Sequence, residues 1–220
     1  MRIFSLLGAV AAVLLLAVPA SAGERLTSCY VGGGAAYSIA VTEASANVPG
    51  LGAVASVDGL SADGWGLFGT LGCDYKFQGN FFVGAFGDFT WDDDTTFDVN
   101  SSLATSPVAQ LTLEHRWTLG ARFGHEFKPG AVGYVLVGYT QAETSSLSSP
   151  ALAVSYAMPD LEGYVLGAGT EILVRDNVYW TAEYTYSDFG DESINLGFAG
   201  ATLDLETKLH AVKTGVKYRF

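Results

Sequence analysis

The chain has little charge, little proline, little cysteine and no long apolar segment. Only 15% of its 220 residues are charged, and it contains six prolines and two cysteines. Its longest apolar run extends from Leu6 to Val18, which is well short of the about 20 residues that a membrane-spanning helix needs. The sequence therefore excludes a protein that crosses a membrane as helices.

Basic residues are also scarce. The chain has 11 Lys and Arg against 23 Asp and Glu, which gives a formal net charge of −12. Because binding to phosphate backbones needs a basic surface, this balance excludes nucleic acid as a partner. What the chain does have is 49% hydrophobic residues, 27 glycines and 13% aromatics. That composition argues against disorder. The apolar residues are dispersed along the chain, which suggests that they alternate with polar ones.

The first residues have the layout of a secretory leader. Arg2 supplies a positive charge, the apolar run to Val18 follows, and Pro19 breaks it before the small-residue motif Ala20-Ser21-Ala22. This order predicts a signal peptide at residues 1–22 and a mature domain at 23–220. The short run and the well-placed cleavage motif disfavour the alternative, an uncleaved anchor. Export would bring the two cysteines into an oxidising compartment.

The mature chain alternates with a period of two. Between Leu113 and Phe127 the odd positions are mostly apolar or aromatic, and the even positions are polar, small or charged. This is the pattern of a β-strand with two different faces. Segment 131–142 is apolar at both phases and cannot be assigned a face. Eight segments in all are expected to form strands: 28–42, 62–77, 80–91, 111–127, 131–142, 161–174, 178–187 and 205–220.

The connections between these segments alternate strictly between short and long. The short ones carry turn-forming residues and lie at 78–80, 128–130 and 175–177. The long ones lie at 43–61, 92–110, 143–160 and 188–204. Short turns at one end and long loops at the other predict an eight-stranded antiparallel up-and-down transmembrane β-barrel, with turns in the periplasm and loops outside. A soluble secreted barrel is the alternative, but it has no reason to alternate its loop lengths.

Charged residues also occur on the polar faces of the predicted strands. These inward positions carry six acids and six bases: Asp74, Asp88, Glu114, Glu126, Glu171 and Glu183, with Lys76, Arg116, Arg122, Lys213, Lys217 and Arg219. Side chains fill the interior of an eight-stranded barrel, and buried charges need partners. The balance therefore predicts a lumen closed by a charge network rather than an open pore. The alternative places about half of these residues at the water-exposed strand ends.

The four long loops are acidic throughout. They contain no Lys or Arg and twelve acids: Glu43, Asp58, Asp92, Asp93, Asp94, Asp98, Glu143, Asp160, Asp188, Asp191, Glu192 and Asp204. Such a surface favours cationic partners. It repels the phosphates of lipopolysaccharide unless divalent cations bridge them.

Three groups of residues raise more specific chemistry. Cys29 and Cys73 fall at the turn ends of neighbouring strands, so they form either a disulfide or two free thiols. Asp92–Asp94 matches no known Ca²⁺-loop spacing, and a solvated loop is the favoured interpretation. His115, His125 and His210 have no serine in an H-x-S pattern, which disfavours acyl transfer. The sequence therefore predicts no catalytic residue, no cofactor and no metal.

The C-terminal half resembles a known family. The ending "LHAVKTGVKYRF" places Val216, Tyr218 and Phe220 on alternate positions and looks like the signal that the outer-membrane barrel assembly machinery reads. The segments "RWTLGARFGHEFKPGAVGYVLVGYT" and "GYVLGAGTEILVRDNVYWTAEYTYSDFG" resemble the small outer-membrane barrels of alphaproteobacteria. Those proteins are labelled "porin family" or "outer membrane protein beta-barrel" and are related to the OmpA transmembrane domain and the opacity-type surface antigens.

The resemblance implies a surface-exposed protein of the Gram-negative outer membrane, in contact with lipid and lipopolysaccharide. We expect a monomeric, non-enzymatic protein that supports envelope integrity and presents its acidic loops to an external partner. A narrow, cation-favouring channel for small solutes is the first alternative, although eight strands leave no aqueous lumen of porin width. A lipid-modifying outer-membrane enzyme is the second alternative.

Overall fold

A computed structural model of the chain describes residues 28–48, 52–99, 109–144, 147–149, 154–156, 160–195 and 202–220. The predicted leader at 1–22 lies outside these residues. Eight long strands dominate the fold: β1 (Ser28–Val48), β2 (Gly52–Lys76), β3 (Phe81–Val99), β4 (Ala109–Lys128), β5 (Ala131–Thr144), β8 (Leu161–Arg175), β9 (Val178–Asn195) and β10 (Thr202–Arg219). Within the described ranges, no helix is long and apolar enough to cross a membrane.

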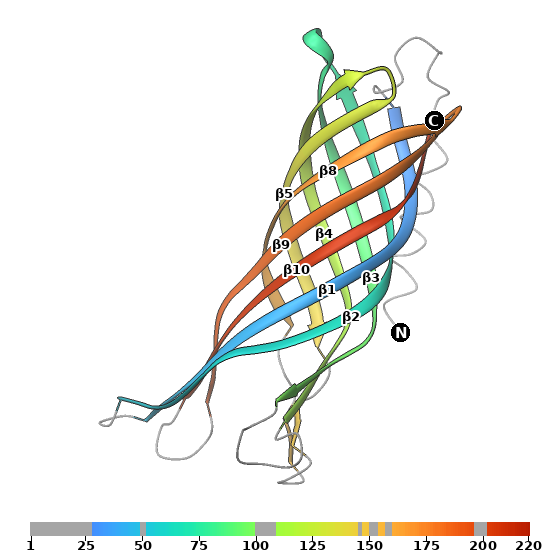
Figure 1. Cartoon of the computed structure of the whole chain (residues 1–220). Coiled ribbons are helices and arrows are strands. Elements are labelled where there is room, and N and C mark those ends of the chain that lie inside the picture. Colours follow the sequence, from blue (N-terminus) through green and yellow to red (C-terminus); the bar gives the residue numbers. More distant parts are fainter. Residues whose placement is uncertain are drawn as a thin grey trace, which may run out of the picture.

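The eight strands close into a barrel. Each pairs antiparallel with the strand before and after it, and β1 pairs with β10 from Tyr30↔Arg219 to Asn47↔Thr202. Figure 1 shows the strands wound around one axis, with the C-terminus beside the end that holds the short turns. Over the residues that the structure describes, closure pairs each of the eight long strands on both sides, as a strand in lipid requires. The predicted fold class is confirmed.

The short connections form as the turn residues predicted. The β2–β3 connection contains the 3₁₀ turn η2 (Gln78–Asn80). Gly79 and Gly130 adopt φ values of 80° and 79° there and in the β4–β5 turn. This left-handed conformation favours glycine, which has no Cβ to clash. The third turn uses Asp176 with a φ of 46°, one of the few other residue types that tolerate this region.

At the other end of the barrel, the predicted long loops are wrong over much of their length, because the strands extend into them. The segment expected to be loop at 43–61 is largely strand, because β1 runs on to Val48 and β2 begins at Gly52. The same holds at 92–110 and 188–204, and segment 143–160 contains the short paired strands β6 (Leu147–Ser149) and β7 (Val154–Tyr156). These strands continue past the point where side-chain alternation fades, because antiparallel pairing satisfies backbone groups whatever the side chains.

The two faces of the barrel wall differ as a membrane barrel requires. On β4, Arg116 and Arg122 are buried inside, while Leu119, Phe123 and Phe127 are exposed on the outside. β5, which the sequence left without a face, places its even residues inside. Exposed large apolar side chains occur on all eight strands. Because lipid covers this face, such exposure is the expected state of the wall.

Cys29 and Cys73 stand directly opposite each other in the β1–β2 register. They form a disulfide. The bond lies at the turn end of the barrel, where the backbone N–H of Phe220 donates to the Cys29 carbonyl at 3.0 Å. The disulfide therefore joins the first hairpin beside the seam where the last strand closes the barrel.

We expect that the folded protein in detergent does not react with maleimide until a reductant is added, because a disulfide has no thiolate to alkylate. Mass spectrometry after labelling measures the number of adducts. Two adducts without reductant, on protein whose folding is verified by its heat-modifiable gel mobility, would contradict the bridge.

Candidate functional site

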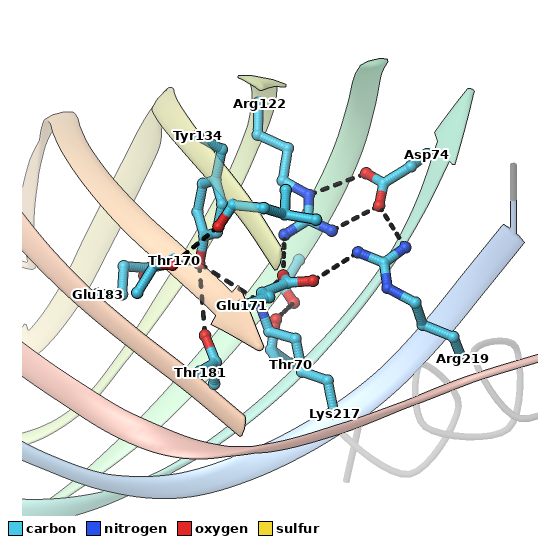
Figure 2. Close-up of polar contacts among 12 residues, drawn as sticks. Thr70, Asp74, Arg122, Tyr134, Thr170, Glu171, Thr181, Glu183, Lys217 and Arg219 are labelled. Carbon is cyan, nitrogen blue, oxygen red and sulfur yellow. Dashed lines mark hydrogen bonds and ion pairs between the residues drawn. The ribbon is translucent and has the colours of Figure 1, made fainter. Parts of the chain in front are cut away.

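The centre of the lumen is a wholly buried carboxylate, Glu171 of β8, with a relative exposure of 0%. Three bases from two other strands surround it. The Arg122 guanidinium donates from Nη1 at 2.6 Å, and the Lys217 ammonium donates at 2.9 Å. Arg219 donates from Nη2 at 2.5 Å. Figure 2 shows these side chains converging from β4, β8 and β10.

A second buried acid, Asp74 of β2, joins the same network. Arg122 donates to both of its carboxylate oxygens, from Nε at 2.8 Å and from Nη2 at 2.5 Å. Arg219 adds a third contact from Nη1 at 2.7 Å. Such two-point contacts between a guanidinium and a carboxylate are strong and directional. Each arginine therefore bridges both acids, and the two arginines together tie four strands to one another across the lumen.

Aromatic rings enclose the bases. The Arg122 guanidinium lies 4.4 Å from the ring centroid of Tyr30 and 4.9 Å from that of Tyr134. Arg219 lies 5.1 Å from the Tyr179 centroid. A cation over a desolvated aromatic face is attracted to its electrons, so these rings hold the bases in place. The Tyr134 hydroxyl also donates to Glu183 at 2.8 Å, which brings a third acid into the cluster.

Glycines make room for this cluster. A Cβ added at Gly84 would lie 2.1 Å from an Asp74 carboxylate oxygen. A Cβ at Gly169 would lie 2.5 Å from the Tyr134 ring. Both positions face the lumen from the wall beside the large side chain that they accommodate. Because an eight-stranded barrel is narrow, glycine is the residue that lets a tyrosine or a paired carboxylate fit inside.

Two further ion pairs flank the cluster. Lys213 donates to Asp88 at 2.5 Å, and both side chains are at most 7% exposed. Lys76 donates to Glu126 at 3.0 Å, with side-chain exposures of 19% and 15%. This second pair therefore stands at the turn-end rim, where water reaches it.

The remaining gap between these side chains is small. A cavity of about 10 Å³ lies among Tyr30, Asp88, Glu183 and Lys213, which is room for about one water molecule. We use the name plug for Asp74, Arg122, Glu171, Lys217 and Arg219 together with the rings of Tyr30, Tyr134 and Tyr179. The plug fills the turn-end half of the lumen.

The remaining predicted lumen charges are Arg116 and Glu114. Arg116 is buried, yet neither of its terminal nitrogens has a hydrogen-bond partner. The side chain of Glu114 lies outside the described residues. Asp92, expected in a solvated loop, is instead buried inside the barrel with both carboxylate oxygens unpartnered. The cause is that β3 continues past the predicted strand end, so Asp92 keeps the inward phase of Asp88 and Thr90.

Sequence reasoning missed the lumen tyrosines. Aromatic residues of a membrane barrel are expected on its outer face, near the two membrane interfaces. Because β5 is apolar on both faces, its sequence does not show whether Tyr134 points inward or outward. The signal that would have placed it is Thr140, a polar residue at an even position of the same strand, which is itself wholly buried. Tyr30 and Tyr179 share the inward phase of the buried polar residues Ser38 and Thr181 on their strands, but only the fold brings them to Arg122 and Arg219.

The barrel, its apolar outer wall and its filled lumen define an outer-membrane β-barrel protein. The chain belongs to the family described as outer membrane protein beta-barrel domain, which it matches over residues 8–220. It is 25% identical over 117 residues to the 25 kDa outer-membrane immunogenic protein of Brucella abortus and to that of Brucella suis. The match covers 48% of this chain and 54% of either relative, so the chain spans about half the length of the curated relatives it matches.

Solved structures show the same fold at low identity. OprG from Pseudomonas aeruginosa superposes with a TM-score of 0.61 at 15% identity, over 90% of this chain and 98% of OprG. The outer membrane protein AlkL gives a TM-score of 0.55 at 16% identity, over 92% of this chain and 95% of AlkL. The family, the relatives and these structures together place the protein in the outer membrane.

Removing a base of the plug should destabilise the protein more than removing a base at the turn-end rim. Arg122→Ala leaves two buried carboxylates short of partners, and we expect it to lower the free energy of unfolding by about 3–5 kcal/mol. Lys76→Ala breaks the partly exposed rim pair and serves as the matched control, with an expected loss of about 1 kcal/mol or less. Guanidinium unfolding in detergent micelles measures both. Equal midpoints for the two variants would show that the plug is solvated.

Proposed function

We propose that the protein is a non-enzymatic surface protein of the outer membrane. In this proposal it supports the integrity of the envelope and presents an acidic extracellular end for interaction, and it conducts no solute. The observation that carries the proposal is the plug. Glu171, Tyr30 and Tyr179 are at most 2% exposed, so the lumen offers no water-filled path at their level. The function of the protein then depends on its outer wall and its exposed end.

The extracellular end supports the second half of the proposal. Acidic side chains are exposed there on β1, β2, β5 and β8: Glu43, Asp63, Glu143 and Glu162. Asp188 faces outward on β9, where a carboxylate is tolerated only beyond the hydrocarbon layer. The backbone N–H of Gly190 donates to it, and this hydrogen bond is the main cause that holds its pKa below the usual range. Asp188 therefore stays charged in mildly acidic surroundings and adds to a surface that suits cationic partners.

The contacts of the histidines support a non-enzymatic role. His115 Nε2 lies 3.0 Å from a Glu143 carboxylate oxygen. His125 packs against Phe81 with ring centroids 4.5 Å apart. His210 shares a hydrogen bond of 2.7 Å with the Tyr184 hydroxyl. Each histidine thus has a wall residue as its partner, and none of these three partners is the serine that the acyl-transfer alternative would use as its nucleophile.

We also propose that the barrel assembly machinery recognises the last strand and that the folded protein is a monomer in contact with outer-membrane lipid and lipopolysaccharide. Val216 and Tyr218 are exposed on the outer wall, and the Tyr218 ring stacks on Phe220 with centroids 6.5 Å apart. These residues stand on the turn-end half of β10, beside the seam with β1.

A conductance measurement is the direct test of the proposal. We expect the purified, refolded mature protein to give no conductance steps in a planar bilayer, because the plug leaves no continuous water path. A heat-modifiable gel shift verifies that the inserted protein is folded. Reproducible cation-favouring steps that vanish in Asp88→Asn would overturn the proposal and favour the narrow cation channel.

The acidic end predicts salt-sensitive binding of a polycation. We expect polylysine to bind proteoliposomes that carry the protein and to be released as the ionic strength rises, because exposed charges are screened. Replacing Asp63, Glu143 and Glu162 by the corresponding amides should weaken binding several-fold. Asp176→Asn at the opposite end is the matched control. Equal losses for the control and the triple variant would show that binding is not specific to the acidic end.

A further inference from the structure

Two opposite charges are buried without partners on the extracellular side of the plug. Asp92 of β3 is 7% exposed, and neither of its carboxylate oxygens has a hydrogen-bond partner. Arg116 of β4 is 4% exposed, and its two terminal nitrogens, Nη1 and Nη2, have none. A buried charge left without a partner is costly. Two such groups of opposite sign on neighbouring strands mark a place where a complementary molecule would bind.

The register places the two side chains close together on the inner wall. Thr90 stands directly opposite Arg116, and Asp92 is two residues further along β3 on the same face. Such diagonal neighbours have backbones about 7–8 Å apart. The Asp92 carboxylate leans away from β4, since a Cβ added at Gly66 of β2 would lie 3.1 Å from its Oδ1. The Asp92 carboxylate and the terminal nitrogens of Arg116 therefore form no hydrogen bond with each other.

Neighbouring polar groups are already engaged. The Thr90 hydroxyl donates to Asp88 at 3.2 Å, and Asp88 also accepts from Lys213. The Thr118 hydroxyl donates to Thr140 at 3.1 Å. These hydroxyl donors therefore do not serve the Asp92 carboxylate. Small side chains line this half of the lumen on β1, where Ala36 and Ala40 are wholly buried. Ser38 between them also has a hydroxyl without a partner.

We propose that Asp92 and Arg116 form a binding site for a small zwitterion. The anionic group of the ligand, a carboxylate, would accept from both terminal nitrogens of Arg116, which present a fork that matches two oxygens. The ammonium group of the ligand would donate to Asp92. An anion alone would leave Asp92 unpaired, and a cation alone would leave Arg116 unpaired, whereas one molecule that carries both charges satisfies both groups at once.

This site goes beyond the proposed function and does not depend on the acidic surface. It lies on the extracellular side of the Asp88–Lys213 pair, and the plug closes the lumen below it. A bound molecule would enter and leave by the extracellular end. The site would therefore capture a solute without passing it through the membrane.

Equilibrium dialysis of the refolded mature protein tests the proposal. The probes are radiolabelled glycine, β-alanine and 4-aminobutyrate, in which one, two and three carbons separate the amine from the carboxylate. We expect saturable binding of one molecule per barrel for at least one of them. We expect binding at least tenfold weaker for acetate and for methylammonium, because each carries only one of the two charges. The preferred spacer reports the separation of the two protein groups.

Asp92→Asn and Arg116→Gln should each weaken zwitterion binding at least tenfold, with a heat-modifiable gel shift to verify folding. Glu126→Gln at the opposite rim is the matched control and should leave binding unchanged. The proposal is overturned if no zwitterion binds wild-type protein saturably, or if both folded variants bind as wild type does. If a variant does not fold, the wild-type comparison decides alone: acetate or methylammonium binding as tightly as the zwitterions would overturn the site.

Discussion

The structure depends on the burial of carboxylates in the middle of a membrane barrel. Glu171 and Asp74 are removed from water, and an isolated ionised carboxylate there would be far too costly to keep. Arg122 and Arg219 each contact both acids, and Lys217 contacts Glu171. Because these partners come from β2, β4, β8 and β10, satisfying the charges also fixes the positions of strands on opposite sides of the lumen.

The inside and outside of the wall obey opposite rules. Outside, lipid accepts apolar side chains and rejects charge, so the wall presents valine, leucine and aromatic rings. Inside the turn-end half, the lumen is too narrow for bulk water, and each charge of the plug has a protein partner. Tyrosine serves the inside well, because its ring packs against a guanidinium while its hydroxyl reaches an acid, as Tyr134 does with Arg122 and Glu183.

The lumen divides into two halves with different chemistry. The turn-end half is filled by paired charges and rings, and its acids Asp74 and Glu171 each accept from more than one base. The extracellular half is lined by small and hydroxyl side chains, and there Asp92 and Arg116 stay unpaired. A barrel closed at one end and polar at the other matches a protein whose contacts are with the outside. The Cys29–Cys73 disulfide between β1 and β2 and the C-terminal seam strengthen the closed end.

The sequence by itself determined the eight strands, the three short connections, and the face of each strand on which apolar and polar residues alternate, since these depend on local turn residues and a local period of two. It also identified the interior charges. Only the tertiary structure decided which acid meets which base, because Asp74 and Arg219 lie 145 residues apart and meet only after closure sets the register. The long strand extensions and the burial of Asp92 were decided there too, since backbone pairing continues where the side-chain pattern ends.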